Sequence, residues 1–336
     1  MDKFKTKMLN TIDVLQNSDC KKNILVLGDA IFDNYAIGEI YRMSPEAPVP
    51  VLSISNTEWR LGGAANVFNN IINLGGNANI CTMLGDDYEG NLIKSKLSKI
   101  NRNIDFIYID KERKTSKKTR YLTKDKKHLL RVDEEDVHPL AEKAATDYIV
   151  NKIKNRINEF DILVISDYAK GFVTESIITP IIKIFRDNNK IVLTDPKSKD
   201  ITKYYGSYLI KPNQDEFLNF IDSHKSNVKI SFVIKQGKKM LNKSKAEYIY
   251  VTLGKKGGIL IGKYIESKFI ESRGKSAIDI TGAGDTVIAC IALALAAGIE
   301  ITDAVEFSSY AAGACVQRIG TTPIDLNNIK QLIEVG

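Results

Sequence analysis

Cysteine is scarce in this sequence, and its spacing does not suit a cysteine-based site. The 336 residues include four cysteines, and no two of them form a Cys-x-x-Cys pair. A disulfide framework has many cysteines for its length, and a zinc site usually has them in close pairs. Cys290 and Cys315 lie in apolar stretches of helical character, whereas Cys20 and Cys81 stand far from any other cysteine. The pattern predicts buried free thiols in a reducing compartment.

Long hydrophobic runs are also lacking. The longest, residues 287–297, is shorter than the roughly 20 residues that cross a bilayer. Residues 1–20 mix lysines with apolar residues at helical spacing. They lack the continuous apolar core and the small-residue cleavage site of a secretion signal. These absences predict a cytoplasmic protein without a membrane partner.

A concentrated basic patch is missing as well. The net charge is +7, from 48 basic and 41 acidic residues. Lysines crowd at residues 111–118 and 124–127, but without the interleaved aromatic residues typical of nucleic-acid binding. Most of the excess is best explained as solvated surface, and the remainder is available to face an anionic ligand. No nucleic-acid partner is expected.

The sequence does contain an alternation of two periodicities. Short apolar runs, typical of buried strands, alternate with amphipathic helical patterns. This alternation predicts an α/β fold with a mainly parallel central sheet and helices on both faces. In such sheets ligands bind beyond the carboxyl ends of the strands. The expected strands lie at residues 23–29, 79–84, 161–166, 190–194, 208–210 and 248–253, and the expected helices at residues 64–74, 88–100, 140–157 and 174–187.

Two segments, residues 36–54 and 106–133, interrupt the alternation. Both lack helical periodicity and contain short strand and turn signals. We expect them to form a small β-sheet lid that projects from the main body, with ordinary surface hairpins as the alternative. No repeat or flexible linker divides the chain, so a single domain is expected over residues 1–336. Because unpaired strand edges seek partners, the lid is also predicted to join two copies into a homodimer.

The strongest chemical signal is Gly282-Ala283-Gly284-Asp285 before an alanine-rich apolar stretch. Small residues allow backbone N–H groups to point into one concave space, and a helix start adds partial positive charge. This arrangement predicts an anion hole for a phosphoryl group in transfer. Asp285, in the first helical turn, is suited to accept a proton from an attacking hydroxyl. From these residues alone, a helix N-cap is an equally good explanation of Asp285.

This segment resembles the C-terminal signature of the ribokinase-like carbohydrate kinase family. Residues 61–67, Leu-Gly-Gly-Ala-Ala-Asn-Val, resemble the N-terminal signature of the same family, and the resemblance extends over nearly the whole chain. It implies a ribokinase-like fold, an ATP-dependent phosphotransfer, and Asp285 as catalytic base beside the anion hole of Gly282, Ala283 and Gly284. It also implies that the sugar is bound by Asp33, Asn34, Gly62, Gly63 and Asn66. Asp29, at the end of the first strand, is equally well explained as a turn cap.

The expected nucleotide site involves the motif Pro212-Asn213-x-x-Glu216, which resembles the family's motif near Mg²⁺ and phosphates. By spacing alone the same pair forms a helix capping box, and both roles are compatible. The resemblance implies ATP and Mg²⁺ as cofactors, with K⁺ as a further candidate. The remaining expected contacts are Lys197 with a phosphate, Thr252, Gly254 and Gly257 beside the nucleotide, and Asp279 and Thr281 with a monovalent cation. An ordinary hairpin turn is the alternative for Gly254 and Gly257.

The stretch that discriminates most between sugars is residues 41–51, Tyr-Arg-Met-Ser-Pro-Glu-Ala-Pro-Val-Pro-Val. It resembles the lid of heptose-phosphate kinases of lipopolysaccharide precursor synthesis, the ADP-heptose pathway, many of which also contain a cytidylyltransferase domain. Residues 166–171 and 320–323 resemble that group too. The resemblance implies D-glycero-β-D-manno-heptose 7-phosphate as the substrate and the 1,7-bisphosphate as the product. The alternatives are a kinase for another sugar, sugar phosphate or nucleoside, and a non-catalytic sugar- or nucleotide-binding regulator.

A sugar that already has a phosphate needs cationic partners for it. The candidates are Arg42, Arg120, Arg131 and Lys170, with a solvated strand face as the alternative for Arg120 and Arg131. Asp167 is a candidate for holding a sugar hydroxyl, and packing alone explains its neighbour Tyr168.

Overall fold

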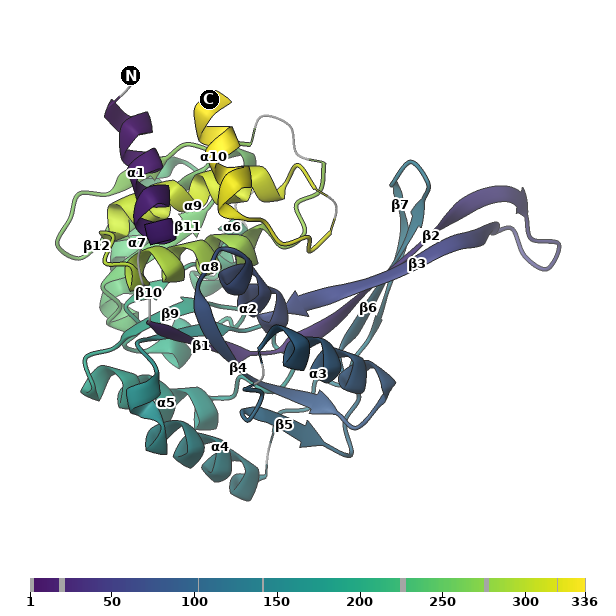
Figure 1. Cartoon of the computed structure of the whole chain (residues 1–336), viewed down its shortest axis with the longest axis horizontal. Helices are drawn as coiled ribbons and strands as arrows, with labels where there is room; N and C mark the ends of the chain where they lie inside the picture. The colour runs from purple at the N-terminus through teal and green to yellow at the C-terminus, as the bar shows by residue number, and fades with distance from the viewer. Residues whose placement is uncertain are drawn as a thin grey trace.

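A nine-stranded sheet forms the centre of the molecule (Figure 1). The structure is a computed structural model that describes residues 3–17, 22–101, 103–140, 142–223, 228–274, 278–318 and 320–335. The strand order is β13-β12-β11-β10-β9-β8-β1-β4-β5. The strands from β11 to β5 are parallel to one another, and β12 is antiparallel to both of its neighbours, β11 and β13. The bounds are β1 Asn23–Gly28, β4 Asn77–Gly85, β5 Ile107–Asp110, β8 Ile162–Ser166, β9 Ile191–Asp195, β10 Leu209–Ile210, β11 Tyr248–Thr252, β12 Gly258–Gly262 and β13 Lys268–Ile270.

The inner strands are apolar throughout because both faces of the sheet are covered. In β1, Leu25 and Leu27 point into one hydrophobic cluster, and Ile24 and Val26 point into a second cluster on the opposite face. Successive side chains of a strand alternate between faces, so an unbroken apolar run serves both clusters. The α/β architecture expected from the alternation is therefore confirmed.

Helices cover both faces of the sheet. Helices α4, α5, α6 and α7 pack on one face, and α2, α3, α8 and part of α9 pack on the other. Helices α1 and α10 lie side by side outside α8 and α9, where the two ends of the described chain meet (Figure 1). The bounds are α1 Lys3–Asn17, α2 Ala64–Asn73, α3 Tyr88–Ile100, α4 Lys143–Asn155, α5 Glu175–Asp187, α6 Gln214–Phe220, α7 Ile230–Ser244, α8 Ala283–Ala296, α9 Ile301–Cys315 and α10 Leu326–Val335.

A second, four-stranded sheet projects from the main body as the expected lid (Figure 1). Its order is β3-β2-β6-β7, with bounds β2 Ala30–Met43, β3 Pro50–Gly63, β6 Lys117–Thr123 and β7 His128–Glu134. The strands β2 and β3 have 14 residues each, longer than the short strands expected for residues 36–54. Only one residue, Asp29, separates the end of β1 from the start of β2, so the lid is an extension of the central sheet's first strand.

One part of the expected lid belongs to the main sheet instead. Residues 107–110 form β5, which pairs in parallel with β4. The reason is hydrophobic: Ile107 and Ile109 pack against one main-body cluster, and Phe106 and Tyr108 belong to or pack against the other. The second lid segment therefore begins at β6.

Helix length and cysteine burial are two further features of the fold. No helix in the described ranges is both long and apolar enough to cross a bilayer. Cys81, Cys290 and Cys315 are buried free thiols, as expected. Cys20 lies outside the described residues.

Candidate active site

A cleft follows the carboxyl ends of the parallel strands. Its polar part has a volume of about 530 Å³ and is lined by Asp195, the last residue of β9, and by Lys211, directly after β10. Its apolar part, of about 190 Å³, is lined by the β11–β12 turn and by residues of α8 and α9. Thr252, Gly254 and Gly284 line both parts, so the two parts adjoin each other.

Helix α8 begins at the wall of this cleft. Gly282 has a φ of 80°, in the left-handed region that favours glycine, and it turns the chain into the helix. The first N–H groups of a helix have no partner within it, and the helix start has partial positive charge. A Cβ on Gly284 would lie 3.5 Å from Nζ of Lys211. The expected anion hole is therefore a glycine-lined helix start with a lysine ammonium facing it.

Asp285 is enclosed at the same helix start. It is 2% exposed, and its two carboxylate oxygens accept hydrogen bonds from two different parts of the chain. Asn66 Nδ2 donates to Oδ2 over 2.8 Å, and the Tyr168 hydroxyl donates to Oδ1 over 2.6 Å. Burial raises the pKa of Asp285 to about 7, against the lowering effects of these two hydrogen bonds and of Lys211, and Asp195 adds to the rise. A carboxylate with this pKa is suited to exchange a proton near neutral pH.

The sequence reading missed the ion pair of Lys211 with Asp195. The ammonium and the carboxylate are 2.9 Å apart, and the Lys211 side chain is 2% exposed. Burial raises the pKa of Asp195, although Lys211 counteracts the rise. Both residues stand at the carboxyl ends of neighbouring strands, which is the signal that could have identified them. They bring a fixed positive charge and a carboxylate to the polar part of the cleft.

The lid strand β3 ends in two glycines, and a close contact requires the first of them. A Cβ on Gly62 would stand 2.4 Å from Oδ2 of Asp33. Gly63 leads directly into α2, whose third residue is Asn66. The amide of Asn66 is oriented by Asn70, which donates to its Oδ1 over 3.3 Å. The structure thus brings Asp33, Gly62, Gly63 and Asn66 together beside Asp285.

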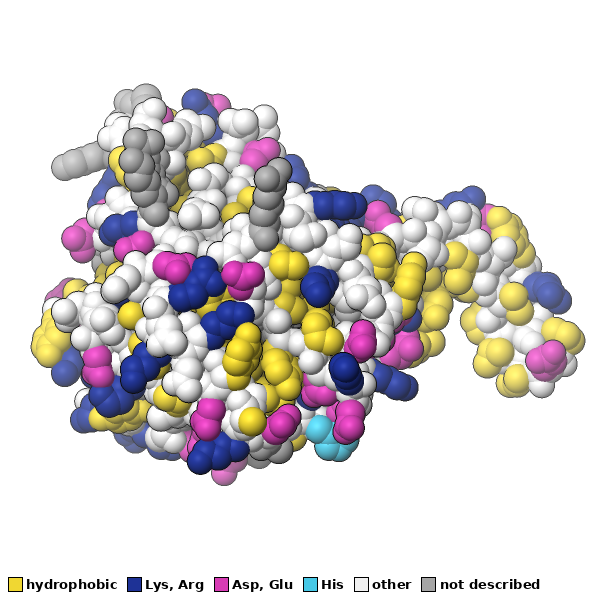
Figure 2. Space-filling model, turned by 60° about the horizontal axis from the view of Figure 1, so that its bottom comes forward, with side chains coloured by type: hydrophobic (Ala, Val, Ile, Leu, Met, Phe, Trp, Pro, Cys, Tyr) yellow, Lys and Arg dark blue, Asp and Glu magenta, His cyan; other side chains and the backbone are white. Residues whose placement is uncertain are grey.

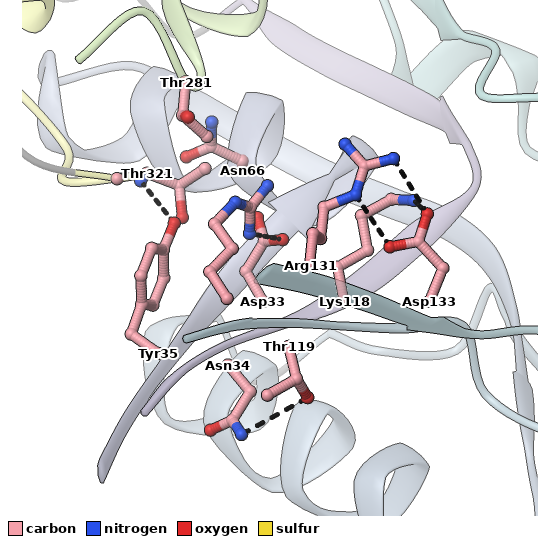
Figure 3. A network of polar contacts seen from close by, with 12 residues as sticks. Asp33, Asn34, Tyr35, Asn66, Lys118, Thr119, Arg131, Asp133, Thr281 and Thr321 are labelled. Atoms are coloured by element: carbon pink, nitrogen blue, oxygen red, sulfur yellow. Dashed lines mark hydrogen bonds and ion pairs between the residues drawn. The ribbon is translucent and has the colours of Figure 1, made fainter. Parts of the chain in front are cut away.

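Four cations gather at the face of the lid that holds Asp33, and Figure 3 labels two of them, Lys118 and Arg131. Arg120 forms a buried ion pair with Asp33 at 2.6 Å. Arg131 and Lys118 share Asp133, each at 2.9 Å, and Lys170 pairs with Glu135 at 2.6 Å. Lys118, Arg120 and Arg131 all lower the pKa of Asp33, although its burial raises that pKa more. Four cations thus share three carboxylates.

Three of the expected substrate residues do not join the cluster formed by Asp33 and the cations around it. Asn34 points to the opposite face of the lid, toward Thr119, because side chains alternate along β2 (Figure 3). Arg42 is nine residues from Asp33 along the same strand, or roughly 30 Å at about 3.3 Å per residue. Asp167 is completely buried and accepts hydrogen bonds from Lys203 and Tyr204, at 2.6 Å each. Its carboxylate is thereby occupied by the protein itself.

The expected nucleotide residues all line the cleft. Asn213 and Glu216 form a complete capping box at the start of α6, with both hydrogen bonds at 2.9 Å. Glu216 also pairs with Lys197 at 3.0 Å, and all three line the polar part of the cleft. Thr252, Gly254 and Gly257 line the apolar part. The connection between the antiparallel strands β11 and β12 is a tight hairpin, which is the alternative explanation of Gly254 and Gly257.

Asp279 and Thr281 lie on the loop before α8. Asp279 Oδ1 accepts from the Thr281 amide over 2.9 Å, and its Oδ2 accepts from the Gly320 amide over 2.8 Å. Burial would raise the pKa of Asp279, but these backbone N–H groups outweigh it and hold the pKa below its ordinary value. An ionised carboxylate therefore lies on the loop before the start of α8.

Replacing Asp285 by asparagine should stabilise the fold in a pH-dependent way. The pKa of Asp285 lies above its unfolded value of 3.8, at about 7. Its ionisation therefore lowers the free energy of unfolding as the pH rises through this window. D285N removes that cost. The free energy of unfolding of D285N, relative to that of the unsubstituted parent protein, should therefore grow by roughly 2 to 3 kcal/mol between about pH 5 and about pH 8.

Urea unfolding of both proteins at the two pH values measures this difference. Asp29, whose pKa burial raises to about 6, is present in both proteins and cancels. An equal difference at both pH values would contradict the raised pKa of Asp285.

Proteins of similar sequence match most of the chain. The "Bifunctional protein HldE" of Desulfatibacillum aliphaticivorans is 34% identical over 334 residues, covering 98% of this chain and 66% of the relative. The protein of the same name from Aliarcobacter butzleri is 37% identical over 311 residues, covering 92% of this chain and 64% of the relative. The chain thus spans about two thirds of the length of these relatives.

Solved structures share the fold. A structure of Arabidopsis thaliana ribokinase complexed with ribose and ATP has a TM-score of 0.70 at 18% identity, covering 93% of this chain and 98% of that one. A structure of phosphofructokinase-2 from Escherichia coli in complex with potassium has a TM-score of 0.72 at 18% identity, covering 94% of this chain and 98% of that one. The sequence pattern of the pfkB family carbohydrate kinases matches residues 21–327. The chain therefore belongs to the PfkB family of carbohydrate kinases, which are ATP-dependent phosphotransferases.

Proposed function

We propose that the chain transfers the γ-phosphoryl group of ATP to the anomeric hydroxyl of D-glycero-β-D-manno-heptose 7-phosphate, giving the 1,7-bisphosphate of the ADP-heptose pathway. The observation that carries the proposal is the buried Asp285 carboxylate, held next to the amides of a helix start and to Lys211. The sugar is supported by the similarity to HldE proteins and by residues 41–51 of the lid.

In the proposed mechanism Asp285 takes the proton of the sugar hydroxyl. The hydroxyl oxygen forms a bond to the γ-phosphorus while the bond to the β–γ bridging oxygen breaks, and ADP leaves. Amides of the Gly282-Ala283-Gly284 turn stabilise the negative charge on the transferring group. Lys211 stabilises the same charge from the opposite wall of the cleft. The adenine lies in the apolar part and the phosphates in the polar part, where both volumes are suitable.

The polar part of the cleft also suits Mg²⁺. Asp195, Asn213 and Glu216 present oxygen donors to one cavity. Within the described ranges no group of three or more His, Cys, Asp or Glu side chains could hold a metal ion, which fits an ion that takes most ligands from phosphates and water. When bound, Mg²⁺ would neutralise charge on the phosphates. K⁺ near Asp279 and Thr281 would stabilise the loop that forms the anion hole.

The sugar's own phosphate would bind to the lid cations. Arg120 and Arg131 are directly opposite each other on β6 and β7, and like charges at opposed positions repel. Their carboxylate partners Asp33 and Asp133 reduce this repulsion, and an anion between them would relieve it further. Arginine is suited to bind a phosphate with two hydrogen bonds. This pair favours a phosphorylated sugar over a neutral one.

The D285N variant is the test of the base. Turnover should fall by about 10²- to 10⁴-fold, the usual contribution of a general base, while ATP binding persists. ADP release should be measured with heptose 7-phosphate, unphosphorylated heptose, fructose 6-phosphate, ribose and adenosine. Near-normal turnover of D285N would refute the base assignment, and a preference for another acceptor would replace the heptose proposal.

The R131Q variant tests the phosphate contact. Its kcat/KM for the sugar phosphate should fall about 10- to 100-fold, since hydrogen bonds to charged groups are worth about 1.5–3 kcal/mol. The KM for ATP should stay within about twofold. Lys127→Gln is the matched control, because Lys127 is 79% exposed at the β6–β7 turn. Equal losses with phosphorylated and unphosphorylated sugars would contradict the assignment.

We also propose a homodimer through the lid, because the lid face opposite to Arg131 is apolar and exposed. Alternation places Leu130 and Val132 opposite to Arg131, and both are exposed, as are Ile40, Met43, Val49 and Ile54. Figure 2 shows hydrophobic side chains along the projecting arm. A second copy could cover this lid face with its own.

Light scattering after size-exclusion chromatography tests the dimer. The parent should have twice the chain mass, and Leu130→Lys should shift it toward the single-chain mass. Val335→Lys, on α10 at a side chain that is 79% exposed, is the control and should remain dimeric. A parent of single-chain mass would rule the dimer out.

A further inference from the structure

The loop after β8 brings a tyrosine hydroxyl to the carboxylate of Asp285. The Tyr168 hydroxyl donates to Oδ1 over 2.6 Å, and Asn66 occupies the other oxygen over 2.8 Å. The sequence alone explained Tyr168 by packing, but packing does not require a hydroxyl at this position. We propose that Tyr168 is a positioning residue for the base: its hydroxyl fixes the orientation of the Asp285 carboxylate and favours its ionised form. This inference rests on the proposed function.

Hydrogen bonds to a buried carboxylate fix the backbone of the loop that contains Tyr168. Asp29, at the end of β1, accepts three backbone hydrogen bonds: from Tyr168 over 2.9 Å, Lys170 over 3.2 Å and Phe172 over 3.1 Å. Asp167 anchors the other side of the loop through its bonds to Lys203 and Tyr204. These two buried carboxylates therefore have the role of supporting the loop, and the hydroxyl of Tyr168 has little freedom to leave Asp285.

The phenol is a permanent donor in this position. Burial, first of all, and then the charges of Asp285, Asp195 and Asp33 raise the pKa of Tyr168 well above its ordinary value. The hydroxyl therefore keeps its proton near neutral pH. A hydrogen bond to the charged form of an acid favours that form. Each carboxylate oxygen retains a further lone pair for the sugar hydroxyl.

Other groups that face Asp285 in the described structure are few. They are Asp195 and Lys211 across the cleft, which act in opposite directions on its pKa, and the neutral Cys315 thiol from α9. Asn66 is the other donor, and it does not titrate. Removal of the Tyr168 hydroxyl should therefore act on Asp285 without the loss of any charged partner.

The test is the pH profile of turnover for Y168F. The inflection on the acid side of kcat should move upward by about one pH unit, so the loss should be about tenfold below the inflection and smaller above it. Tyr208→Phe is the matched control, because Tyr208 precedes β10 at the opposite end of the strand and packs on Tyr248 at 5.1 Å. Its inflection should equal that of the parent. A merely structural role of Tyr168 predicts the same loss at every pH, so an unchanged inflection would overturn the proposal.

A measurement without turnover separates this proposal from the proposed function. The stabilisation gained by D285N should continue to grow to a higher pH in the Y168F background than in the parent background, by about one pH unit. If no sugar is phosphorylated by any of these proteins, the proposed function fails, and the unfolding experiment alone decides on the hydrogen bond. In that case an identical pH dependence in both backgrounds overturns the role of Tyr168.

Discussion

A carboxylate removed from water needs hydrogen-bond donors, and Asp285 obtains them from segments that are far apart in sequence. Asn66 comes from the helix after the lid, and Tyr168 comes from the loop after the central strand β8. Both must meet the start of α8, so the helix, the lid base and the strand end have fixed relative positions. Burial without these donors would leave the group protonated, since desolvation disfavours its charged form. The contacts around one side chain thus account for much of the architecture of the cleft.

Local patterns predicted those parts of the molecule that depend on local physics. Small residues before an alanine-rich run indicated the glycine-containing start of α8 at Gly282–Gly284, and the period of apolar residues indicated the strands and helices. The capping box of Asn213 and Glu216 followed from spacing. Contacts between distant segments were not predictable in the same way. The Lys211–Asp195 pair joins two strand ends, and Tyr168 reaches Asp285 across 117 positions. Strand ends mark Lys211 and Asp195 as candidates for the cleft, but nothing near Tyr168 in the sequence marks Asp285 as its partner.

Strand geometry explains why the structure does not bring all the predicted sugar contacts together. Adjacent residues of a strand face opposite sides, so Asp33 and Asn34 cannot both face one ligand. The same alternation gives the lid two different surfaces. Lys118, Arg120 and Arg131 lie on the face toward the cleft, while Leu130 and Val132 lie on the other. One sheet therefore has a charged face and an apolar face, and neither face requires a separate structural element.

Under the proposed function, two anion-binding regions act on one substrate from opposite ends. The start of α8 and Lys211 attract the phosphates of ATP, and the lid arginines attract the phosphate already on the sugar. Between them lie Asp33 and Asp285, whose carboxylates would repel either phosphate but can accept hydrogen bonds from hydroxyl groups. A phosphorylated sugar is then aligned by charge alone, with its phosphate at the lid and its reactive hydroxyl at Asp285. A sugar bound in the reverse direction would place its phosphate against the carboxylates of Asp33 and Asp285, which would repel it. Binding of the remote phosphate at the lid therefore helps to orient the reacting hydroxyl.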